Sequence, residues 1–238
     1  MITARRSIVD FDRKYDRFVG QANRRLRQED KLAVINEALE IYFENRVKVA
    51  ETDSKVRDDL RVLEMKEVKI PLVISEENFN VYEIPAESYR VLRKRVVASK
   101  EDCGEKDIPL IMFQTDDIDN ARNSPYWRSS FQWEHAISDE GSKGLYVWHE
   151  GDFKIVKTII DYYRKPKEIH APSMTSEKKY EDWNGIIREK DQGLELTDTY
   201  SHRKIIDIAV LIARANVGDV RDFDIQLNKI LNVEKINN

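Results

Sequence analysis

Three consecutive stretches decide the predicted fold, namely Phe131-Gln132-Trp133-Glu134-His135-Ala136-Ile137, Gly144-Leu145-Tyr146-Val147-Trp148 and Phe153-Lys154-Ile155-Val156-Lys157-Thr158-Ile159-Ile160-Asp161-Tyr162-Tyr163. Apolar residues alternate with polar ones in these stretches, which is typical of strands that bury one face of a sheet. Asp139 to Gly144 and Glu150-Gly151 supply the turn residues between them. The sequence therefore predicts a three-stranded antiparallel meander.

Helical patterns flank this meander on both sides. Between Leu32 and Ala50 apolar residues recur every three or four positions, with Asp30 as the expected cap. Asp53 or Ser54 is expected to begin the next helix. Near the other end of the chain, Ser201 is expected to cap a helix that Gly218 ends, and a last helix follows.

These patterns predict an α+β fold in which N- and C-terminal helices pack beside a central antiparallel β-rich domain. The expected parts are a helical segment at 7–65, a β-rich domain at 66–170, an extended arm or loop at 171–195 and a helical segment at 196–238. Within the β-rich domain, Pro85 to Tyr89 is predicted as the first turn of a helix. Asp116 to Asn120 is predicted to open a short helix before Pro125.

Composition narrows the class of protein. The 238 residues are 41% hydrophobic, enough for a substantial core, and the 40 basic residues nearly balance the 44 acidic ones. A formal charge of −4 with interleaved signs argues against tight nucleic-acid binding. The single Cys103 excludes an intramolecular disulfide, and no run resembles a membrane span or a signal core. We therefore expect a soluble protein that folds in a reducing cytoplasm.

Motifs of catalysis or metal binding are not apparent. The four histidines lie far apart, and the best metal candidate among them, His135 with His149, is better explained as ordinary sheet residues. Asp116, Asp117 and Asp119 suit Mg²⁺ chemically, but helix capping also explains them. Gly141 to Gly144 lies between two predicted strands, so it is predicted to form a turn rather than a phosphate-binding loop. We predict no enzymatic activity, no metal and no cofactor.

Several side chains are instead candidates for contacts with partners. The tryptophans of the β-rich region, Trp127, Trp133 and Trp148, are predicted to lie in a packed core or an interface. The predicted partner-interface residues come from a basic run, the arm and the last helix, and are Arg24, Arg25, Arg27, Tyr180, Trp183, Ile186, Phe223 and Leu227.

The order of segments resembles the ring or adaptor proteins of the head-to-tail neck in tailed phages, in particular crAss-like and related Bacteroides phages. The residues that carry the resemblance lie between about 30 and 230, and are Ile84 to Tyr89, Asn123 to Tyr126, Phe131 to Ile137, Gly151 to Phe153, Asp161 to Pro166 and His202 to Val210.

The resemblance implies a non-enzymatic virion subunit, assembled in the cytoplasm of the bacterial host. It implies a homo-oligomeric ring, expected to be a dodecamer, that docks on the portal protein, contacts other neck or tail proteins and continues the DNA channel toward the tail. Genomic DNA would pass through the lumen without specific binding, and no membrane is involved. Like-charge walls suit such a conduit, because they hold the duplex weakly.

Two alternatives stay open at the level of sequence. One is a nucleic-acid-binding or metal-dependent DNA-processing protein that uses basic helices and the Asp116 to Asp119 segment. The other is a different virion component, such as a tail or baseplate subunit.

Overall fold

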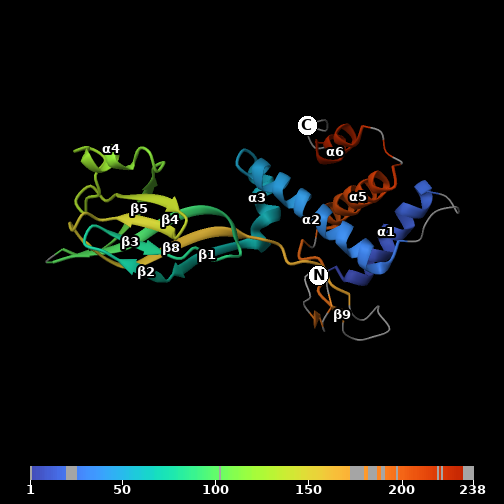
Figure 1. The fold of residues 1–238 in the computed structure, drawn as a ribbon, viewed down its shortest axis with the longest axis horizontal. Coiled ribbons are helices and arrows are strands. Elements are labelled where there is room, and N and C mark those ends of the chain that lie inside the picture. Colours follow the sequence, from blue (N-terminus) through green and yellow to red (C-terminus); the bar gives the residue numbers. More distant parts are fainter. Residues whose placement is uncertain are drawn as a thin grey trace. The chain divides into compact units, whose positions relative to one another are not determined.

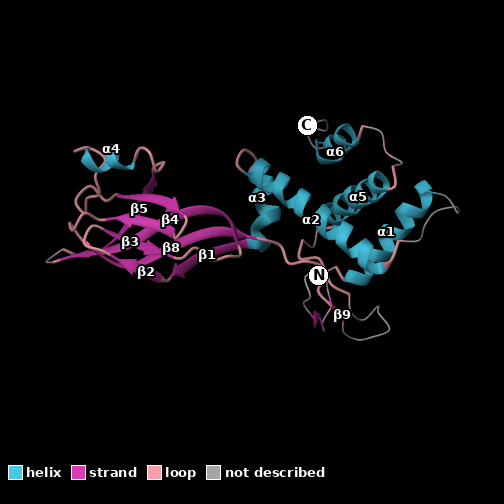
Figure 2. Ribbon diagram, viewed as in Figure 1, coloured by secondary structure: helices cyan, strands magenta, loops and turns pink. Residues whose placement is uncertain are grey.

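The chain folds into two units, each described here by itself (Figures 1 and 2). The structure, a computed structural model, describes residues 2–19, 26–101, 103–171, 180–181, 187–188, 191–196, 198–218, 220 and 222–232. The β unit is Leu63–Lys165, and the helical unit combines Met1–Val62 with Pro166–Asn238. The predicted α+β class is confirmed, since helices from both ends of the sequence accompany one large sheet.

The β unit is built on an eight-stranded sheet with the order β1-β8-β4-β5-β6-β7-β3-β2. Its elements are β1 (Glu64–Ile70), β2 (Leu72–Ser75), β3 (Phe79–Tyr82), β4 (Ser88–Lys100), β5 (Gly104–Met112), α4 (Ile118–Asn123), β6 (Ala136–Gly141), β7 (Gly144–Trp148) and β8 (Lys154–Arg164).

Both edges of this sheet belong to one extended segment. Pro71 alone separates β1 from β2, yet β1 pairs with β8 while β2 pairs with β3. Proline has no N–H to donate, but the Pro71 carbonyl accepts a hydrogen bond from Glu83 N at 3.1 Å. The sheet therefore curls until its first and last strands are halves of the same segment, each of which pairs with one other strand.

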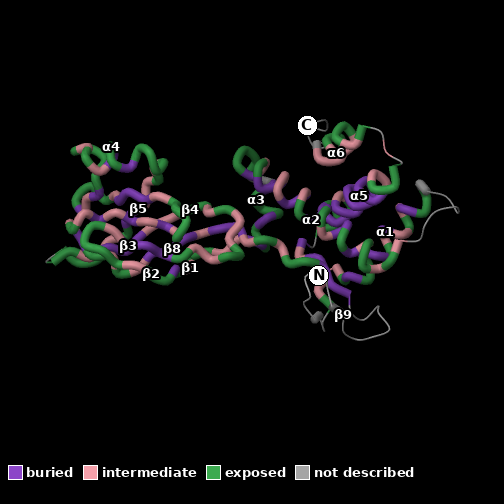
Figure 3. The backbone as a smooth tube through the Cα atoms, in the orientation of Figure 1, coloured by how far each residue is buried: buried purple, intermediate pink, exposed green. Residues whose placement is uncertain are grey.

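The curled sheet encloses an apolar core, visible as the buried stretches of its strands in Figure 3. Alternate residues of the long strands point inward, as the two-residue period of a strand requires. The core consists of Ile70, Tyr82, Val96, Ala98, Ile108, Phe131, Ala136, Leu145, Val147, Phe153, Ile160 and Tyr162.

The predicted meander is only partly correct. β6 and β7 form the expected antiparallel hairpin around Ser142 and Lys143. Gly144 is required there, because a Cβ at its φ of +128° would lie 2.2 Å from the Tyr82 carbonyl oxygen. The third strand, β8, does not pair with β7 but lies between β1 and β4.

A parallel pair also departs from the predicted antiparallel domain. β5 and β6 run in the same direction, with Ile111 opposite Ile137. A parallel pair needs a long connection, and residues 113–135 supply it. Consequently Phe131 to Glu134 form turns rather than the predicted strand, which begins only at Ala136.

The predicted helical turn after Pro85 is also wrong. Ser88 N donates to the Pro85 carbonyl at 2.8 Å, which closes a tight turn, and β4 begins at Ser88.

The helical unit contains α1 (Ala4–Val19), α2 (Gln28–Ala50), α3 (Ser54–Leu60), α5 (Thr199–Asn216) and α6 (Phe223–Asn232), with a short hairpin of β9 (Tyr180–Glu181) and β10 (Ile187–Arg188). A 3-10 turn, η1 (Arg61–Leu63), leads out of α3. α5 packs against α1, α2 and α6. The predicted apolar stripe of α2 is confirmed as buried, namely Leu32, Ile35, Leu39, Tyr42, Phe43, Val47 and Ala50.

Two helix caps differ from the prediction. α2 begins at Gln28, so Asp30 lies inside the first turn and accepts from Arg27 N at 3.2 Å. α5 is capped by Asp198, whose carboxylate accepts from the backbone N–H groups of Tyr200 and Ser201. Ser201 itself is buried, because it lies in the first turn of the helix on the face toward α2.

Only the two ends of the predicted 171–195 arm are well covered by the structure. His170 pairs with Gln192, and Leu194 pairs with Ile2, in short bridges. Ile169, Ala171 and Leu194 are fully buried. The arm therefore leaves from and returns to the core of the helical unit.

A buried polar network joins α2 to α5. The Tyr42 hydroxyl contacts Ser201 Oγ at 2.9 Å and accepts from Arg46 Nε at 2.7 Å. Arg46 also lies 3.5 Å from the Asp59 carboxylate of α3. Burial raises the pKa of Tyr42, so the hydroxyl stays protonated and bridges the two helices.

We expect Tyr42→Phe to destabilise the helical unit by about 1–3 kcal/mol, because it removes a hydroxyl shared by two buried polar partners. Urea unfolding followed by far-ultraviolet circular dichroism measures this change. The matched variant Y42F/S201A removes both partners of one hydrogen bond. Its loss of unfolding free energy should therefore be less than the sum of the losses for Tyr42→Phe and Ser201→Ala. Full additivity would contradict the network.

Candidate functional site

The connection between β5 and β6 presents the most exposed aromatic side chains of the β unit. Residues 113–135, here called the insertion, contain α4 and the turns around it. Tyr126 is 82% exposed, Trp133 76% and Trp127 51%. These three residues form the aromatic surface. Exposed aromatics on one short segment are typical of a binding surface.

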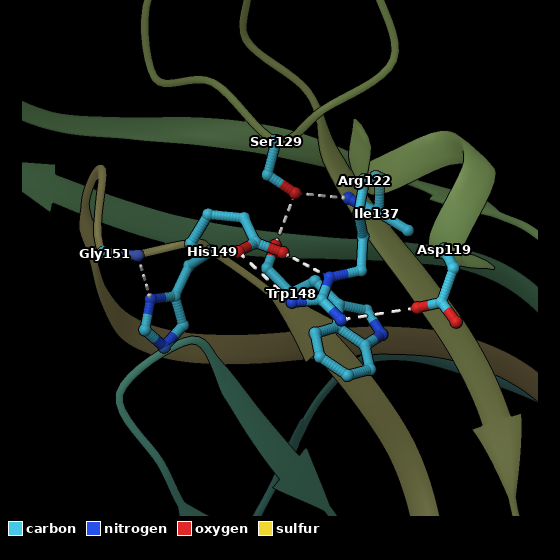
Figure 4. Close-up of polar contacts among 8 residues, drawn as sticks. Asp119, Arg122, Ser129, Ile137, Trp148, His149 and Gly151 are labelled. Atoms are coloured by element: carbon cyan, nitrogen blue, oxygen red, sulfur yellow. Dashed lines mark hydrogen bonds and ion pairs between the residues drawn. The ribbon is translucent and has the colours of Figure 1, made fainter. Parts of the chain in front are cut away.

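α4 is held to the sheet by Arg122. Its guanidinium donates to both carboxylate oxygens of Glu150, at 2.5 and 3.4 Å, and lies 4.1 Å from the centre of the Trp148 ring (Figure 4). Phe79 packs against the same indole, with ring centres 4.7 Å apart. The hydrogen bond to Glu150 raises the pKa of Arg122, so the pair stays charged.

Ser129 makes a second anchor. Its hydroxyl donates to the Trp148 carbonyl at 2.5 Å and accepts from Ile137 N at 2.9 Å, which ties the insertion to β6 and β7 (Figure 4). Beneath it, Ile118 and Ala121 of α4 pack on Ile137. The insertion is therefore seated on the sheet by both apolar and polar contacts.

Asp152 fixes the far end of the insertion. Its carboxylate accepts from Phe131 N at 2.8 Å and from Lys100 Nζ at 2.5 Å. Burial acts to raise the pKa of Asp152, but these two hydrogen bonds outweigh it, and the net pKa is lowered. The carboxylate therefore stays ionised and holds Phe131 against the core.

His135 links the two tryptophans of the aromatic surface through their backbones. Its Nε2 lies 3.2 Å from the Trp127 carbonyl oxygen and its Nδ1 lies 3.4 Å from the Trp133 carbonyl oxygen. The Trp127 ring also meets Phe113 edge-on, with centres 5.9 Å apart. The exposed rings are thus presented by an ordered backbone, which lowers the entropy cost of binding.

The structure places few of the predicted interface residues in detail. Arg24, Arg25, Trp183 and Ile186 lie outside the described residues. Tyr180 belongs to β9, and only its backbone is described. Arg27 is exposed just before α2, while Phe223 and Leu227 are half-buried on α6, which packs against α5. These predictions remain predictions.

Of the residues considered for metal binding, His135 and His149 contact backbone atoms through their ring nitrogens. His149 Nδ1 accepts from Gly151 N at 3.2 Å, and Asp117 precedes α4 at its cap position without a side-chain cap bond. Among the described residues, no group of three or more His, Cys, Asp or Glu side chains could hold a metal ion. Cys103 is exposed. Within the same residues, no helix has the length and apolar character needed to cross a membrane.

No protein-family model and no curated protein matches this chain.

Sequence reasoning did not select the aromatic surface as a site. It assigned Trp133 to a strand and weighed Trp127 as core or interface. The available signal was the cluster of turn-forming residues around the rings, Asn123 to Pro125 before Tyr126 and Ser129-Ser130 after Trp127. An aromatic between such turns has no strand neighbour to cover it.

We expect Arg122→Ala to destabilise the β unit by about 1–3 kcal/mol, because it leaves Glu150 half-buried without its bidentate partner. Denaturation followed by tryptophan fluorescence reports this unit, which holds three of the four tryptophans. Arg122→Lys should recover only part of the loss, since lysine cannot form the planar two-bond contact. The exposed Lys143→Ala is the control, and equal effects at both positions would contradict the anchor.

We expect the β unit to lose stability as the pH falls below about 6.5, the ordinary pKa of histidine. Burial lowers the pKa of His149 although Glu150 acts to raise it. The folded state then binds fewer protons than the unfolded state, so acidification favours unfolding. His149→Asn keeps an acceptor for Gly151 N and should flatten this dependence between about pH 7 and about pH 5. An unchanged slope in fluorescence-monitored unfolding would count against the assignment.

Proposed function

We propose that this chain is a non-enzymatic structural subunit of the head-to-tail connector of a tailed phage, forming a ring that docks on the portal and continues the DNA channel. The observation that carries the proposal is the aromatic surface. Tyr126 and Trp133 expose most of their area, while the backbone beneath them is tied to the sheet by Arg122, Ser129 and Asp152. Rigid, exposed aromatics are the usual anchors of protein–protein interfaces.

Other features support assembly as the function. Each unit contains ion pairs of its own. Lys14 and Asp207 lie 2.6 Å apart in the helical unit, and Lys106 and Glu134 lie 2.8 Å apart in the β unit. A surface with balanced charge suits many polar contacts at subunit rims. A net charge of −4 also suits a passage through which DNA slides without being retained.

The resemblance to neck proteins supplies the particular assembly. The proposal places the chain in the virion neck, as a ring of identical copies that contacts the portal and further neck or tail proteins. The aromatic surface would bury its rings against one of these chains, because burial of a large aromatic side chain contributes about 1.5–3 kcal/mol.

The test is co-sedimentation of the purified chain with purified portal protein. We expect a complex, and we expect Y126S/W133S to weaken it by roughly a hundredfold or more, which corresponds to the loss of two interface anchors. L92S/V156S is the matched control, since both residues are exposed apolar side chains of the same unit outside the insertion.

Three results would overturn the proposal. These are a chain that never joins the portal, a virion neck that lacks it, and an activity that makes or breaks covalent bonds. Strong salt-dependent DNA binding would favour the nucleic-acid alternative, and location in the tail or baseplate would favour the other one.

A further inference from the structure

A charged groove with an apolar floor lies on the outer face of the sheet, across β1, β8, β4 and β5. It encloses about 450 Å³, and its lining includes Lys69, Arg95, Val97, Lys157 and Ile159. Ile159 lies opposite Lys69 on one side and Arg95 on the other, while Val97 lies between Lys157 and Asp107. The two apolar side chains therefore form a strip between charged ones. Each is only 6–7% exposed.

The arginine of the groove is already neutralised. Arg95 contacts Asp107 at 2.7 Å and Glu67 at 2.9 Å. Glu67 reaches it from a bulge in β1, where its φ is +56° and its backbone N–H donates to Asp161 at 2.6 Å. Arg95 is thus a fixed part of the wall and has little attraction left for another anion.

Two lysines of the groove are not neutralised in this way. Lys106 pairs with Glu134, but within the described part of the chain neither Lys69 nor Lys157 has a carboxylate within 4.0 Å. They lie diagonally across β1 and β8, close enough to repel each other. One acid of the lining, Glu105, also has no ion pair with the residues that the structure describes, so the unpaired groups of the groove are two lysines and one carboxylate.

The insertion carries the complementary features. It contains four acidic residues against two arginines, and Asp116 and Asp117 are exposed and form no ion pair among the described residues. The same segment presents the aromatic surface. One short element thus combines unpaired carboxylates with exposed apolar rings, as the groove combines unpaired lysines with an apolar floor.

We propose that the insertion of one copy docks in the groove of the next copy, with Asp116 and Asp117 paired to Lys69 and Lys157. The two surfaces are different parts of the β unit, so the contact is head-to-tail, and repetition of such a contact generates a closed ring or a filament. This inference rests on the proposed function and names the subunit contact of its ring. The portal would then meet surfaces outside the groove and the insertion, and Y126S/W133S would weaken portal binding by disrupting the ring.

The experiment is sedimentation velocity of charge-swapped full-length chains. K69E/K157E alone and D116K/D117K alone should each weaken self-association by roughly tenfold or more, because an attractive pair becomes a repulsive one. An equimolar mixture of the two variants should restore assembly with both chains in equal amounts, since each unlike contact again joins opposite charges. Circular dichroism verifies that each variant is folded.

Matched controls separate this contact from general charge effects. K143E/K154E changes two exposed lysines of the same unit that form no ion pair with any residue the structure describes, and should assemble like the parent chain. In a mixture of K143E/K154E with D116K/D117K, the amount of assembled protein should not exceed the amount that K143E/K154E forms alone. Parent-like assembly of K69E/K157E, or failure of the swapped mixture to restore assembly, would overturn the inference.

Portal co-sedimentation distinguishes this inference from the proposed function. If the chain binds the portal but its copies associate independently of the groove, the proposed function stands and the inference is wrong. Copies that join through the groove without ever binding the portal overturn the connector role and leave the contact between copies intact.

Discussion

The closure of the sheet through a single segment is the constraint on which the β unit depends. Residues 64–75 pair with β8 in their first half and with β3 in their second half, with only Pro71 between. β1 and β2 are the two end strands of the sheet, and they are joined end to end. This connection forces the strands to curl around one apolar core, and the groove lies on the outer face of β1, β8, β4 and β5.

The parallel pairing of β5 and β6 is a second constraint on the β unit. A parallel neighbour requires a long return connection, and residues 113–135 provide it at one end of the sheet. The connection is long enough to carry its own helix and to leave aromatic rings uncovered. Arg122, Ser129 and Asp152 then convert a loop into an ordered platform. The features of the candidate site thus follow from topology rather than from a local motif.

The helical unit shows a different principle, in which distant parts of the sequence complete one core. α1 and α2 come from the start of the chain and α5 from its end, and a buried network through Tyr42 joins them. The amphipathic stripe of α2 predicted its own burial correctly, because helix periodicity is local. Its partner was not predictable in the same way, since nothing in the stripe distinguishes one apolar helix face from another.

The sequence by itself determined the α+β class, the helices of both ends and the β6–β7 hairpin, because propensity, periodicity and turn chemistry act over a few neighbouring residues. Only the tertiary structure decided the strand order, the turn conformation of Phe131 to Glu134 and the gathering of Lys69 with Lys157 on one face. These depend on which strands become neighbours across long separations. Strand pairing is chosen by the packing of the whole core, and the alternation of a single strand is compatible with many partners.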